Sequence, residues 1–488
     1  MRAIELFDDL QIAGHPTPEI EISGVQHDSR RVTAGDLFVA LVGERFDGRV
    51  FVGEAVQNGA VAALGSGPAP AGLQIPWFES AQPRAILGPL SARVHGHPDR
   101  EMLTVGITGT NGKSTVVALV AAALEAAGHS CGRLGTLGYR FKDHVFPGER
   151  TTPEASDLFS TLRAIRDRGG DSVVMEVSSH ALALDRVEGM GFDVAVFTNL
   201  TRDHFDFHPD YEDYFQAKRR LFSQLDEGGR AVLNLDDPYG RRLADEIPGA
   251  LTYGASAEVR CESSRLDRDG IEAEFVTPRG PVRITSALLG RYNVENLTTA
   301  LAVCEALELD HESAAAALGS VGPIPGRMEL LDLGQDVPIL IDYAHTDAAL
   351  QAVLEAAREL YGPRVVAVFG CGGDRDPGKR VLMGRVAGQL AAIPILTSDN
   401  PRREDPLAII AAVEEGLRQA NNEDYLVEPD RRSALRRAMS LASTADVIVI
   451  AGKGHEEVQI VGDRELPFSD ATEIKAALED GIGQAQNG

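Results

Sequence analysis

The 488-residue sequence is poor in cysteine and has no long apolar run. Its cysteines, Cys131, Cys261, Cys304 and Cys371, lie far apart and form no C-x-x-C motif, which favours separate reduced thiols over a disulfide framework. No stretch approaches the roughly 20 apolar residues of a membrane-spanning helix. The N-terminal segment carries acidic residues where a secretory signal needs an apolar core. These absences predict a cytoplasmic protein without stable membrane insertion.

Positive charge is also scarce. The sequence has 47 Lys and Arg against 73 Asp and Glu, so its formal net charge is −26. A protein that binds nucleic acid by general electrostatic attraction needs the opposite sign. We therefore expect no nucleic-acid partner, and any bound polyanion must be held by local donors. The rest of the composition, 43% hydrophobic and 25% charged, is that of a globular protein.

The order of apolar and polar segments predicts an α/β protein of about three domains. Residues 1–100 contain short β-like runs and end in the polar turn HPDR. Residues 101–327 and 328–488 each alternate buried apolar runs with helical segments, which is typical of a parallel sheet covered on both faces. Ligands of such sheets bind beyond the carboxyl ends of the strands, so we expect functional residues in the loops that follow strands.

The strongest motif is a glycine-rich loop between a strand and a helix. Leu103–Ile107 is expected to be a buried strand, and residues 108–115 (TGTNGKST) precede an alanine-rich helix. Such a loop directs backbone N–H groups and a helix dipole at a phosphate. Lys113 would reach the terminal phosphates and Ser114 would offer a hydroxyl to Mg²⁺. The strict Walker spacing would need glycine at Ile107, but the strand–loop–helix context still predicts a nucleoside triphosphate site.

Three further residues are candidates for the same site. Glu176 ends an expected strand and is a candidate Mg²⁺ ligand. His204 could bind a second metal or make a core hydrogen bond, and the neighbouring Asp203 and Asp206 leave both readings open. Lys218 falls inside the apolar stripe of an expected helix over 210–222, so it is either a snorkelling lysine or one turned toward a site. The stripe consists of Tyr211, Tyr214, Phe215, Leu221 and Phe222.

Together these motifs resemble the Mur ligase family. The motifs of the central region are GTNGKST (109–115), MEVSSH (175–180), TNLTRDH (198–204), YEDYFQAK (211–218) and GRYNVENLTTALA (290–302). Those on either side are HDSR (27–30), GDLFVALVGERFDGR (35–49), PGRME (325–329), DYAHT (342–346), FGCGGDRDPGKR (369–380), SDNPRREDP (398–406) and AGKGHEEVQ (451–459). The resemblance covers essentially the whole chain. It implies a small α/β UDP-binding domain (1–100), a central P-loop-type parallel-sheet ATPase domain (101–327) and a C-terminal Rossmann-like α/β domain that binds an amino acid (328–488).

The resemblance implies an ATP-dependent, amide-bond-forming ligase of peptidoglycan precursor synthesis, and so a part in cell-wall biogenesis, cell shape and cell division. The C-terminal motifs are similar to those of members that add meso-2,6-diaminopimelate to the D-Glu of UDP-N-acetylmuramoyl-L-Ala-D-Glu through an acyl phosphate. Diaminopimelate differs from lysine by a carboxylate at its far end, and the guanidinium of Arg402 is a fixed cationic partner for such a group.

Other functions stay open as alternatives. Members that add L-lysine or ornithine are similar elsewhere but typically lack the arginine of DNPR. A folate-polyglutamate-type ligase shares the GTNGK loop, although the HDSR and DNPR motifs argue against it. A catalytically inactive nucleotide-binding regulator would be expected to have lost catalytic residues, and these are intact.

The resemblance also implies roles for individual residues, with ATP and Mg²⁺ as cofactors and a monomer as the expected state. The catalytic residues would be Lys113, Glu176, His204 and Lys218. ATP would contact Gly109, Thr110, Asn111, Gly112, Lys113, Ser114, Thr115, Asn293, Asn296, Arg327 and Asp342. The UDP-linked substrate would contact Ser29, Thr151, Thr152, Ser178 and Arg186. Diaminopimelate would contact Arg375, Asp399, Asn400, Pro401, Arg402, Gly452 and Glu456. Magnesium would be held by Ser114, Glu176, His204 and Lys218, the last as its N6-carboxylated (carbamylated) form.

Three positions depart from the family pattern. Arg150 stands where an asparagine often precedes the Thr-Thr pair, Leu184 where a glutamine is common, and Asp347 where DYAHT is usually followed by proline. The first two concern contacts to the nucleotide sugar. The third is expected to change only the start of a helix, where aspartate is also favoured.

Overall fold

The computed structural model describes residues 1–10, 12–13, 20–43, 46–148 and 150–482. Glu44 and Arg45, which belong to the motif over 35–49, lie outside the described residues. The chain folds as two compact units that alternate along the sequence. The first consists of Met1–Gly109, Leu124–Phe197 and Gln216–Val232, and the second of Thr110–Ala123, Thr198–Phe215 and Leu233–Gly488. Helices and mainly parallel sheets alternate in both, as the α/β prediction requires.

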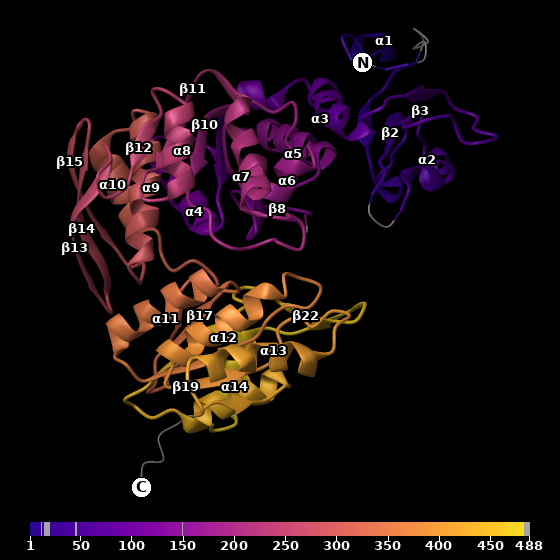
Figure 1. The fold of residues 1–488 in the computed structure, drawn as a ribbon. Coiled ribbons are helices and arrows are strands. Elements are labelled where there is room, and N and C mark those ends of the chain that lie inside the picture. Colours follow the sequence, from indigo (N-terminus) through magenta and orange to yellow (C-terminus); the bar gives the residue numbers. More distant parts are fainter. Residues whose placement is uncertain (11, 14–19, 44–45, 149, 483–488) are drawn as a thin grey trace. The chain divides into compact units, whose positions relative to one another are not determined.

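The first unit begins with a small parallel sheet of order β1-β2-β3-β4 (Figure 1). Along β2, Leu37 and Val39 join one apolar core while Phe38 and Ala40 join another, because successive side chains of a strand point to opposite faces. The strands are β1 Gly24–Gln26, β2 Asp36–Ala40, β3 Ala62–Gly65 and β4 Trp77–Glu79. The helices are α1 Ala3–Leu6, α2 Val52–Gln57 and α3 Pro83–Val94, with 3₁₀ turns η1 Ser29–Arg31, η2 Gly48–Phe51 and η3 Pro98–Glu101.

The larger sheet of the first unit has the order β11-β10-β5-β9-β6-β7-β8. Strands β10, β5, β9 and β6 run parallel, and the register pairs Ile107 with Glu176 and Thr108 with Phe197. The carboxyl ends of β5, β9 and β10 therefore meet at one edge, as expected for the loops that carry the motifs. The strands are β5 Leu103–Thr108, β6 Cys131–Gly135, β7 Gly138–Phe141, β8 His144–Phe146, β9 Ser172–Glu176, β10 Phe192–Phe197 and β11 Leu225–Asn234. The helices are α5 Ala155–Asp167 and α6 Ser179–Ala183, with the 3₁₀ turn η4 Arg220–Gln224.

Two helices carry residues of both units, α4 (Lys113–Ala126) and α7 (Tyr211–Arg219). Lys218 is turned inward and does not snorkel, since only 1% of the residue is exposed. The expected apolar stripe was wrong at one position, because Tyr211 in the first turn of α7 is 39% exposed. The helix is also shorter than expected, since η4 takes over at Arg220.

The second unit contains an antiparallel sheet of order β13-β14-β15 and a larger sheet of order β16-β17-β21-β18-β19-β20. Its elements before the larger sheet are α8 Pro238–Glu246, β12 Leu251–Tyr253, β13 Arg260–Asp267, β14 Gly270–Thr277, β15 Gly280–Ser286, α9 Tyr292–Ala306 and α10 His311–Ser320. The strands that follow are β16 Glu329–Leu331, β17 Ile339–Asp342, β18 Val365–Phe369, β19 Ile393–Leu396, β20 Leu426–Val427, β21 Val447–Ala451, β22 Val458–Val461 and β23 Arg464–Pro467. The helices are α11 Asp347–Tyr361, α12 Gly378–Leu390, α13 Pro406–Gln419, α14 Arg431–Leu441 and α15 Asp470–Glu479.

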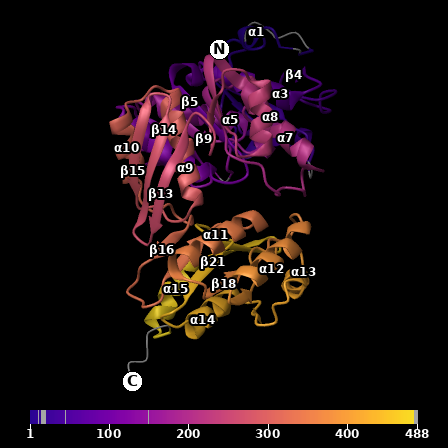
Figure 2. The same ribbon diagram turned by 60° about the vertical axis from the view of Figure 1, so that its left-hand side comes forward.

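Helices cover both faces of this larger sheet (Figures 1 and 2). Along β18, Val365 and Ala367 pack in one core with helices α11, α12 and α13, whereas Val366 and Val368 pack in the other with α14 and α15. Strands β17, β21, β18, β19 and β20 are parallel, and β16 is the antiparallel edge. The apolar runs predicted a parallel sheet covered on both faces, and the structure confirms this arrangement for these five strands.

The four cysteines are all free thiols, three of them buried and Cys261 half-buried. Within the described part of the chain, no helix is long and apolar enough to span a membrane.

Candidate functional site

The phosphate loop lies between β5 and α4, as the sequence predicted. Gly109 and Gly112 adopt φ angles of +148° and +88°, which residues with a side chain rarely tolerate. Lys113, the first residue of α4, donates a hydrogen bond from Nζ to the backbone oxygen of Thr110 at 2.9 Å. A Cβ at Gly112 would come within 2.5 Å of Asn296 Oδ1, so the loop and helix α9 approach closely only because this residue is glycine.

Several other predicted ATP contacts gather around this loop in the second unit. Asn296 donates to Asn293 Oδ1 at 2.7 Å, and Asn293 donates to the backbone oxygen of Leu289 at 2.7 Å. Arg327 donates from Nη2 to Ser114 Oγ at 3.0 Å and lies over the ring of Tyr343. Thr115 is buried in the first turn of α4.

Asp342, the last residue of β17, is buried rather than open to solvent. Its two oxygens accept backbone hydrogen bonds from Met328 and Ala344, each at 2.7 Å. Burial raises the pKa of this carboxyl, and the charge of Arg327 opposes that shift. Its visible role is to hold the turn at the end of β17 and, through Met328, the segment that carries Arg327.

The phosphate loop is tied to the loop that follows β10, residues 198–210, called here the β10–α7 loop. Thr110 donates through its backbone N to Asn199 O at 2.8 Å and receives a hydrogen bond from Thr201 N at 3.0 Å. Asn111 donates through its backbone N to Asn199 Oδ1 at 2.9 Å and from Nδ2 to Thr201 Oγ1 at 3.1 Å. Thr198 Oγ1 donates to Asn111 O at 2.7 Å. Thr198, Asn199 and Thr201 were not among the predicted site residues, although they stand inside the motif TNLTRDH.

Two predicted metal ligands lie in the first unit. Lys218 donates from Nζ to the backbone oxygen of Gly109 at 2.8 Å. Glu176 is 2% exposed and accepts hydrogen bonds from the backbone N and the hydroxyl of Thr136 at 2.9 and 3.1 Å. Among the described residues there is no group of three or more His, Cys, Asp and Glu side chains that could hold a metal.

The residues predicted to hold the UDP-linked substrate are also in the first unit. Thr152 donates from its hydroxyl to Glu176 O at 2.8 Å and accepts from Ser178 N at 3.0 Å. Thr151 lies beside Thr136, with 3.1 Å between their hydroxyl oxygens. Ser29 is the first residue of the 3₁₀ turn η1, and its hydroxyl donates a hydrogen bond to Glu54.

An unpredicted carboxylate, Glu154, organises this region. It is 5% exposed, and its oxygens lie 3.0 Å from Arg186, 3.0 Å from Arg84 and 2.8 Å from Arg150. Burial would raise its pKa, but the charges of these arginines lower it below the usual range. Arg150, the first departure from the family pattern, therefore pairs with Glu154. At the second, Leu184, the backbone oxygen accepts from Arg84 at 3.3 Å.

The predicted amino-acid residues form one connected cluster in the second unit. Glu456 Oε2 accepts hydrogen bonds from Asn400 Nδ2 and Lys453 Nζ, both at 2.9 Å. A Cβ at Gly452 would lie 2.3 Å from Asp399 Oδ2, so glycine makes room for that carboxylate. Lys453, whose side chain is fully buried, was missed as a functional residue although it stands inside the quoted AGKGHEEVQ motif.

Arg402 occupies a strained and well-held position in this cluster. Its φ is +50°, its backbone N donates to Ile460 O at 3.0 Å, and its O accepts from Gly462 N at 2.7 Å. Its Nη1 donates to Gly373 O at 2.9 Å. Burial and the neighbouring charge of Arg375 lower the pKa of the guanidinium. Strand β22 and the turn after it thus fix the backbone that carries this side chain, just after Pro401.

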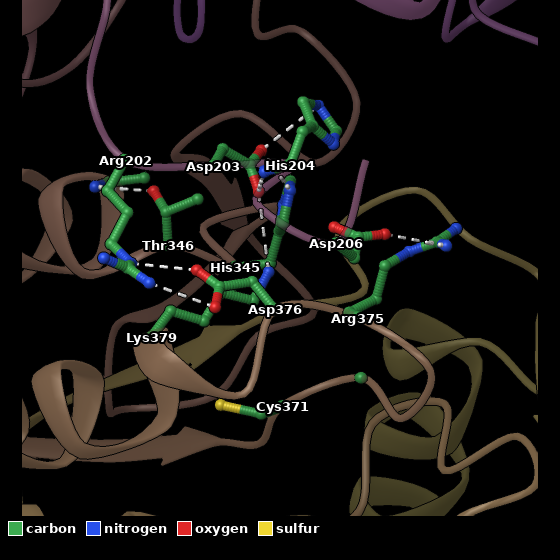
Figure 3. A network of polar contacts seen from close by, with 12 residues as sticks. Arg202, Asp203, His204, Asp206, His345, Thr346, Cys371, Arg375, Asp376 and Lys379 are labelled. Atoms are coloured by element: carbon green, nitrogen blue, oxygen red, sulfur yellow. Dashed lines mark hydrogen bonds and ion pairs between the residues drawn. The ribbon is translucent and has the colours of Figure 1, made fainter. Parts of the chain in front are cut away.

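Figure 3 shows how the second half of the β10–α7 loop meets residues 345–379. Arg202 forms a two-pronged ion pair with Asp376, at 2.8 and 3.1 Å. Asp203 lies 3.3 Å from His204 Nε2, 3.5 Å from His345 Nε2 and 3.7 Å from Lys379 Nζ. Burial would raise the pKa of Asp203, but these basic groups hold it well below its usual value.

At Asp347, the third departure, the preceding Thr346 is the helix cap, and its hydroxyl accepts from Ala349 N. Asp347 is the first residue of α11. Asp347 therefore does not cap the helix but follows the capping residue, in the first turn of α11.

Comparison with known proteins identifies the family. The model of the Mur ligase family catalytic domain matches residues 21–95, that of the Mur ligase middle domain matches 107–304, and that of the Mur ligase glutamate ligase domain matches 326–454. The UDP-N-acetylmuramoyl-L-alanyl-D-glutamate–2,6-diaminopimelate ligase of Geobacter metallireducens is 42% identical, over 94% of this chain and 95% of its own length. The ligase of the same name from Streptomyces coelicolor is 41% identical, over 97% of this chain and 96% of its own.

Solved structures of related ligases have the same fold. A structure of UDP-N-acetylmuramoyl-L-alanyl-D-glutamate–2,6-diaminopimelate ligase aligns with a TM-score of 0.68 at 32% identity, over 99% of both chains. The MurF ligase of Thermotoga maritima in complex with ADP shares the fold, with a TM-score of 0.68 at 19% identity, over 96% of this chain and 100% of its own. This chain belongs to the Mur ligase family.

Proposed function

We propose that this protein is the ATP-dependent ligase that joins meso-2,6-diaminopimelate to the D-Glu of UDP-N-acetylmuramoyl-L-Ala-D-Glu. The observation that carries the proposal is the amino-acid cluster. Arg402, fixed by β22, and Glu456, fixed by Lys453, offer opposite charges to one ligand. A diamino acid with an additional carboxylate needs both kinds of partner.

The residues present fit a nucleoside triphosphate. The glycine conformations of the phosphate loop leave no room for a side chain at Gly112, and the amides of residues 109–114 lead into the start of α4. Backbone amides at a helix start bind phosphate, and Lys113 adds a positive charge there. Arg327, placed beside Ser114, would neutralise further charge.

For magnesium, the fit depends on the chemical form of Lys218. Mg²⁺ prefers oxygen ligands, which the Ser114 hydroxyl and the Glu176 carboxylate provide. A protonated lysine cannot serve, whereas an N6-carboxylated Lys218 supplies carboxylate oxygens from a buried position. We include His204 as the remaining ligand. When bound, the ion neutralises charge on phosphate oxygens.

In the proposed reaction ATP phosphorylates the D-Glu carboxylate, giving an acyl phosphate and ADP. The amine of diaminopimelate then displaces phosphate and loses a proton to form the amide. The chain's own contribution is positioning and charge neutralisation, which dominate phosphoryl transfer. Thr152, Ser178 and Arg186 would hold the UDP-linked peptide. Glu456 would pair the ammonium that does not react, and Arg402 would pair the distal carboxylate. Because the substrates are ATP and a UDP-linked precursor, we place the reaction in the cytoplasm.

Phosphate release tests the proposal. The protein is incubated with ATP, Mg²⁺ and UDP-N-acetylmuramoyl-L-Ala-D-Glu, with either meso-diaminopimelate or L-lysine. We expect turnover with diaminopimelate and little with lysine, because a site built to pair a carboxylate rejects an analogue that lacks it. A preference for lysine would overturn the assigned specificity. No turnover with either amino acid would overturn the proposed activity.

A further inference from the structure

The β10–α7 loop contacts two of the proposed binding regions at once. Thr198, Asn199 and Thr201 in its first half hydrogen-bond to Thr110 and Asn111 of the phosphate loop. Its second half pairs with residues of the amino-acid-binding segment through three charged side chains, within a stretch of five residues (Figure 3). All these residues belong to the second unit.

We propose that the β10–α7 loop couples amino-acid binding to nucleotide binding, and that Arg202 is the positioning residue that anchors it. The inference rests on the proposed function, because it takes the phosphate loop and Arg375 as parts of the two binding sites. It adds a role for Arg202 and Asp376, neither of which is among the predicted contacts to any substrate.

The pairing of Arg202 with Asp376 is the strongest of these four contacts. Both prongs of the guanidinium reach the carboxylate, whose side chain is 5% exposed. Bidentate pairs of this kind fix orientation as well as distance. The guanidinium also lies 4.5 Å from the ring centre of Phe205. A Cβ at Gly378 would lie 2.4 Å from Arg202 Nη2, so the arginine can occupy this position only because residue 378 is a glycine.

Asp376 connects Arg202 to the segment that leads into helix α12. Its Oδ1 also accepts a hydrogen bond from Gly378 N, at 2.8 Å, where helix α12 begins. The preceding residue, Arg375, is a predicted diaminopimelate contact, and its Nη1 lies 3.6 Å from Asp206 Oδ2 of the same loop. An incoming carboxylate that binds Arg375 therefore acts on a side chain that the β10–α7 loop already holds.

The two middle contacts strengthen the link. The side chain of Asp203 is 8% exposed and faces His345, between β17 and α11, and Lys379 in the first turn of α12. Lys379 is itself buried. Because the loop contacts both regions, a ligand that favours one position of the loop at one end also favours it at the other, so the second ligand binds more tightly. Such coupling must be reciprocal between the two ligands.

The test compares ligand affinities in variants of the full-length protein. Isothermal titration calorimetry gives the Kd of the non-hydrolysable analogue AMPPCP, with Mg²⁺ and UDP-N-acetylmuramoyl-L-Ala-D-Glu present, with and without meso-diaminopimelate. In the unaltered protein we expect diaminopimelate to lower this Kd by about fivefold or more, the lower end of typical coupling. The coupling ratio is the Kd without diaminopimelate divided by the Kd with it. Asp376→Asn keeps an oxygen to accept from Gly378 N but weakens the ion pair, so this ratio should approach one.

Arg202→Lys keeps the positive charge but cannot donate two parallel hydrogen bonds to Asp376, so this variant should retain only part of the coupling. The matched control is Glu212→Gln. Glu212 also forms a two-pronged pair, with Arg242, which lies 4.4 Å from the ring centre of Phe215, but this pair does not involve residues 343–380. It should leave the coupling ratio unchanged.

A coupling ratio near one in the unaltered protein would overturn the inference, and so would an undiminished ratio in both Asp376→Asn and Arg202→Lys. If Asp376→Asn fails to fold, Arg202→Lys alone decides. Absence of turnover with diaminopimelate in the unaltered protein would instead overturn the proposed function, so the two failures are distinguishable.

Discussion

Lys218 donates a hydrogen bond from Nζ to the backbone oxygen of Gly109 at 2.8 Å, although the two residues are 109 positions apart in the sequence. Helix α7 thus brings a buried lysine to the start of the phosphate loop. A snorkelling lysine would keep its ammonium in water, so the structure decides between the two readings that the sequence left open.

Replacing this lysine should remove activity. Lys218→Ala should lower kcat by at least about 10²-fold, the cost of losing a charge-stabilising group in a closed site, while binding of the UDP-linked substrate persists. The exposed neighbour Arg219→Ala is the control and should keep activity. A ¹³C carbamate signal after incubation with labelled bicarbonate, present in the unaltered protein and absent in Lys218→Ala, would support the modified form. Near-normal turnover of Lys218→Ala would exclude it as a metal ligand.

Adding a methyl group to the phosphate loop should weaken ATP binding. Gly112→Ala places a Cβ 2.5 Å from Asn296 Oδ1 at a φ of +88°, so the loop or helix α9 must move. We expect the KM for ATP to rise by about tenfold or more, since small misplacements at a phosphate site are costly. Gly128→Ala is matched in backbone conformation, with φ at +94° and nothing within 4 Å of its Cβ, and should leave this KM unchanged. Equal effects of the two variants would point to general strain.

The guanidinium of Arg402 should determine amino-acid affinity. Arg402→Lys keeps the charge but loses the fork, and we expect the KM for diaminopimelate to rise by about 10- to 100-fold, equivalent to one charged hydrogen bond. The KM for ATP should change little. Arg403→Lys, whose side chain is 57% exposed, serves as the control. A rise confined to the KM for ATP would remove Arg402 from the amino-acid site.

The carboxylate of Glu154 should stabilise the protein in a pH-dependent way. Burial would raise its pKa, but three arginines lower it below the usual value of 4.5. A lowered folded-state pKa adds stability above the unfolded pKa, and this stability is lost as the pH falls through the folded value. Glu154→Gln should therefore lower the Tm most at neutral pH, by the equivalent of about 3 kcal/mol. The difference should shrink below about pH 4.5.

The control for this effect is Glu125→Gln. Glu125 pairs with Arg133 at the surface, where both side chains are more than 40% exposed, and such pairs contribute about 1 kcal/mol or less. Thermal unfolding between pH 3.5 and 8 measures both variants. A Tm difference for Glu154→Gln that is independent of pH would show that lost packing, not charge, causes it.

Local patterns were enough to predict the phosphate loop, because the strand, the glycines and the helix are contiguous in sequence. Lys218 was singled out for a similar reason, since a charged residue inside an apolar stripe is visible at helical spacing. Tyr211 was misassigned because a helical repeat does not show where the covering core ends. In the structure the first turn of α7 projects beyond it.

Glu154 and Arg202 were missed as candidate site residues because most of their partners lie far away in the sequence. The partners of Glu154 are Arg84 and Arg186 as well as the nearby Arg150, and Arg202 pairs across 174 positions with Asp376. An isolated charge in a sequence is more often solvated than paired, so no local pattern distinguishes these residues. Only the packing of separate segments shows which charges are buried.

The burial of the thiols makes the chain convenient for site-specific labelling. Burial raises the pKa of Cys131, Cys304 and Cys371 to about 12, so almost none of these thiols is a nucleophilic thiolate at neutral pH. Cys261 on β13 is only half-buried, and a maleimide dye should react there first. A single fluorophore can thus be attached to the antiparallel sheet of the second unit without removing any native cysteine.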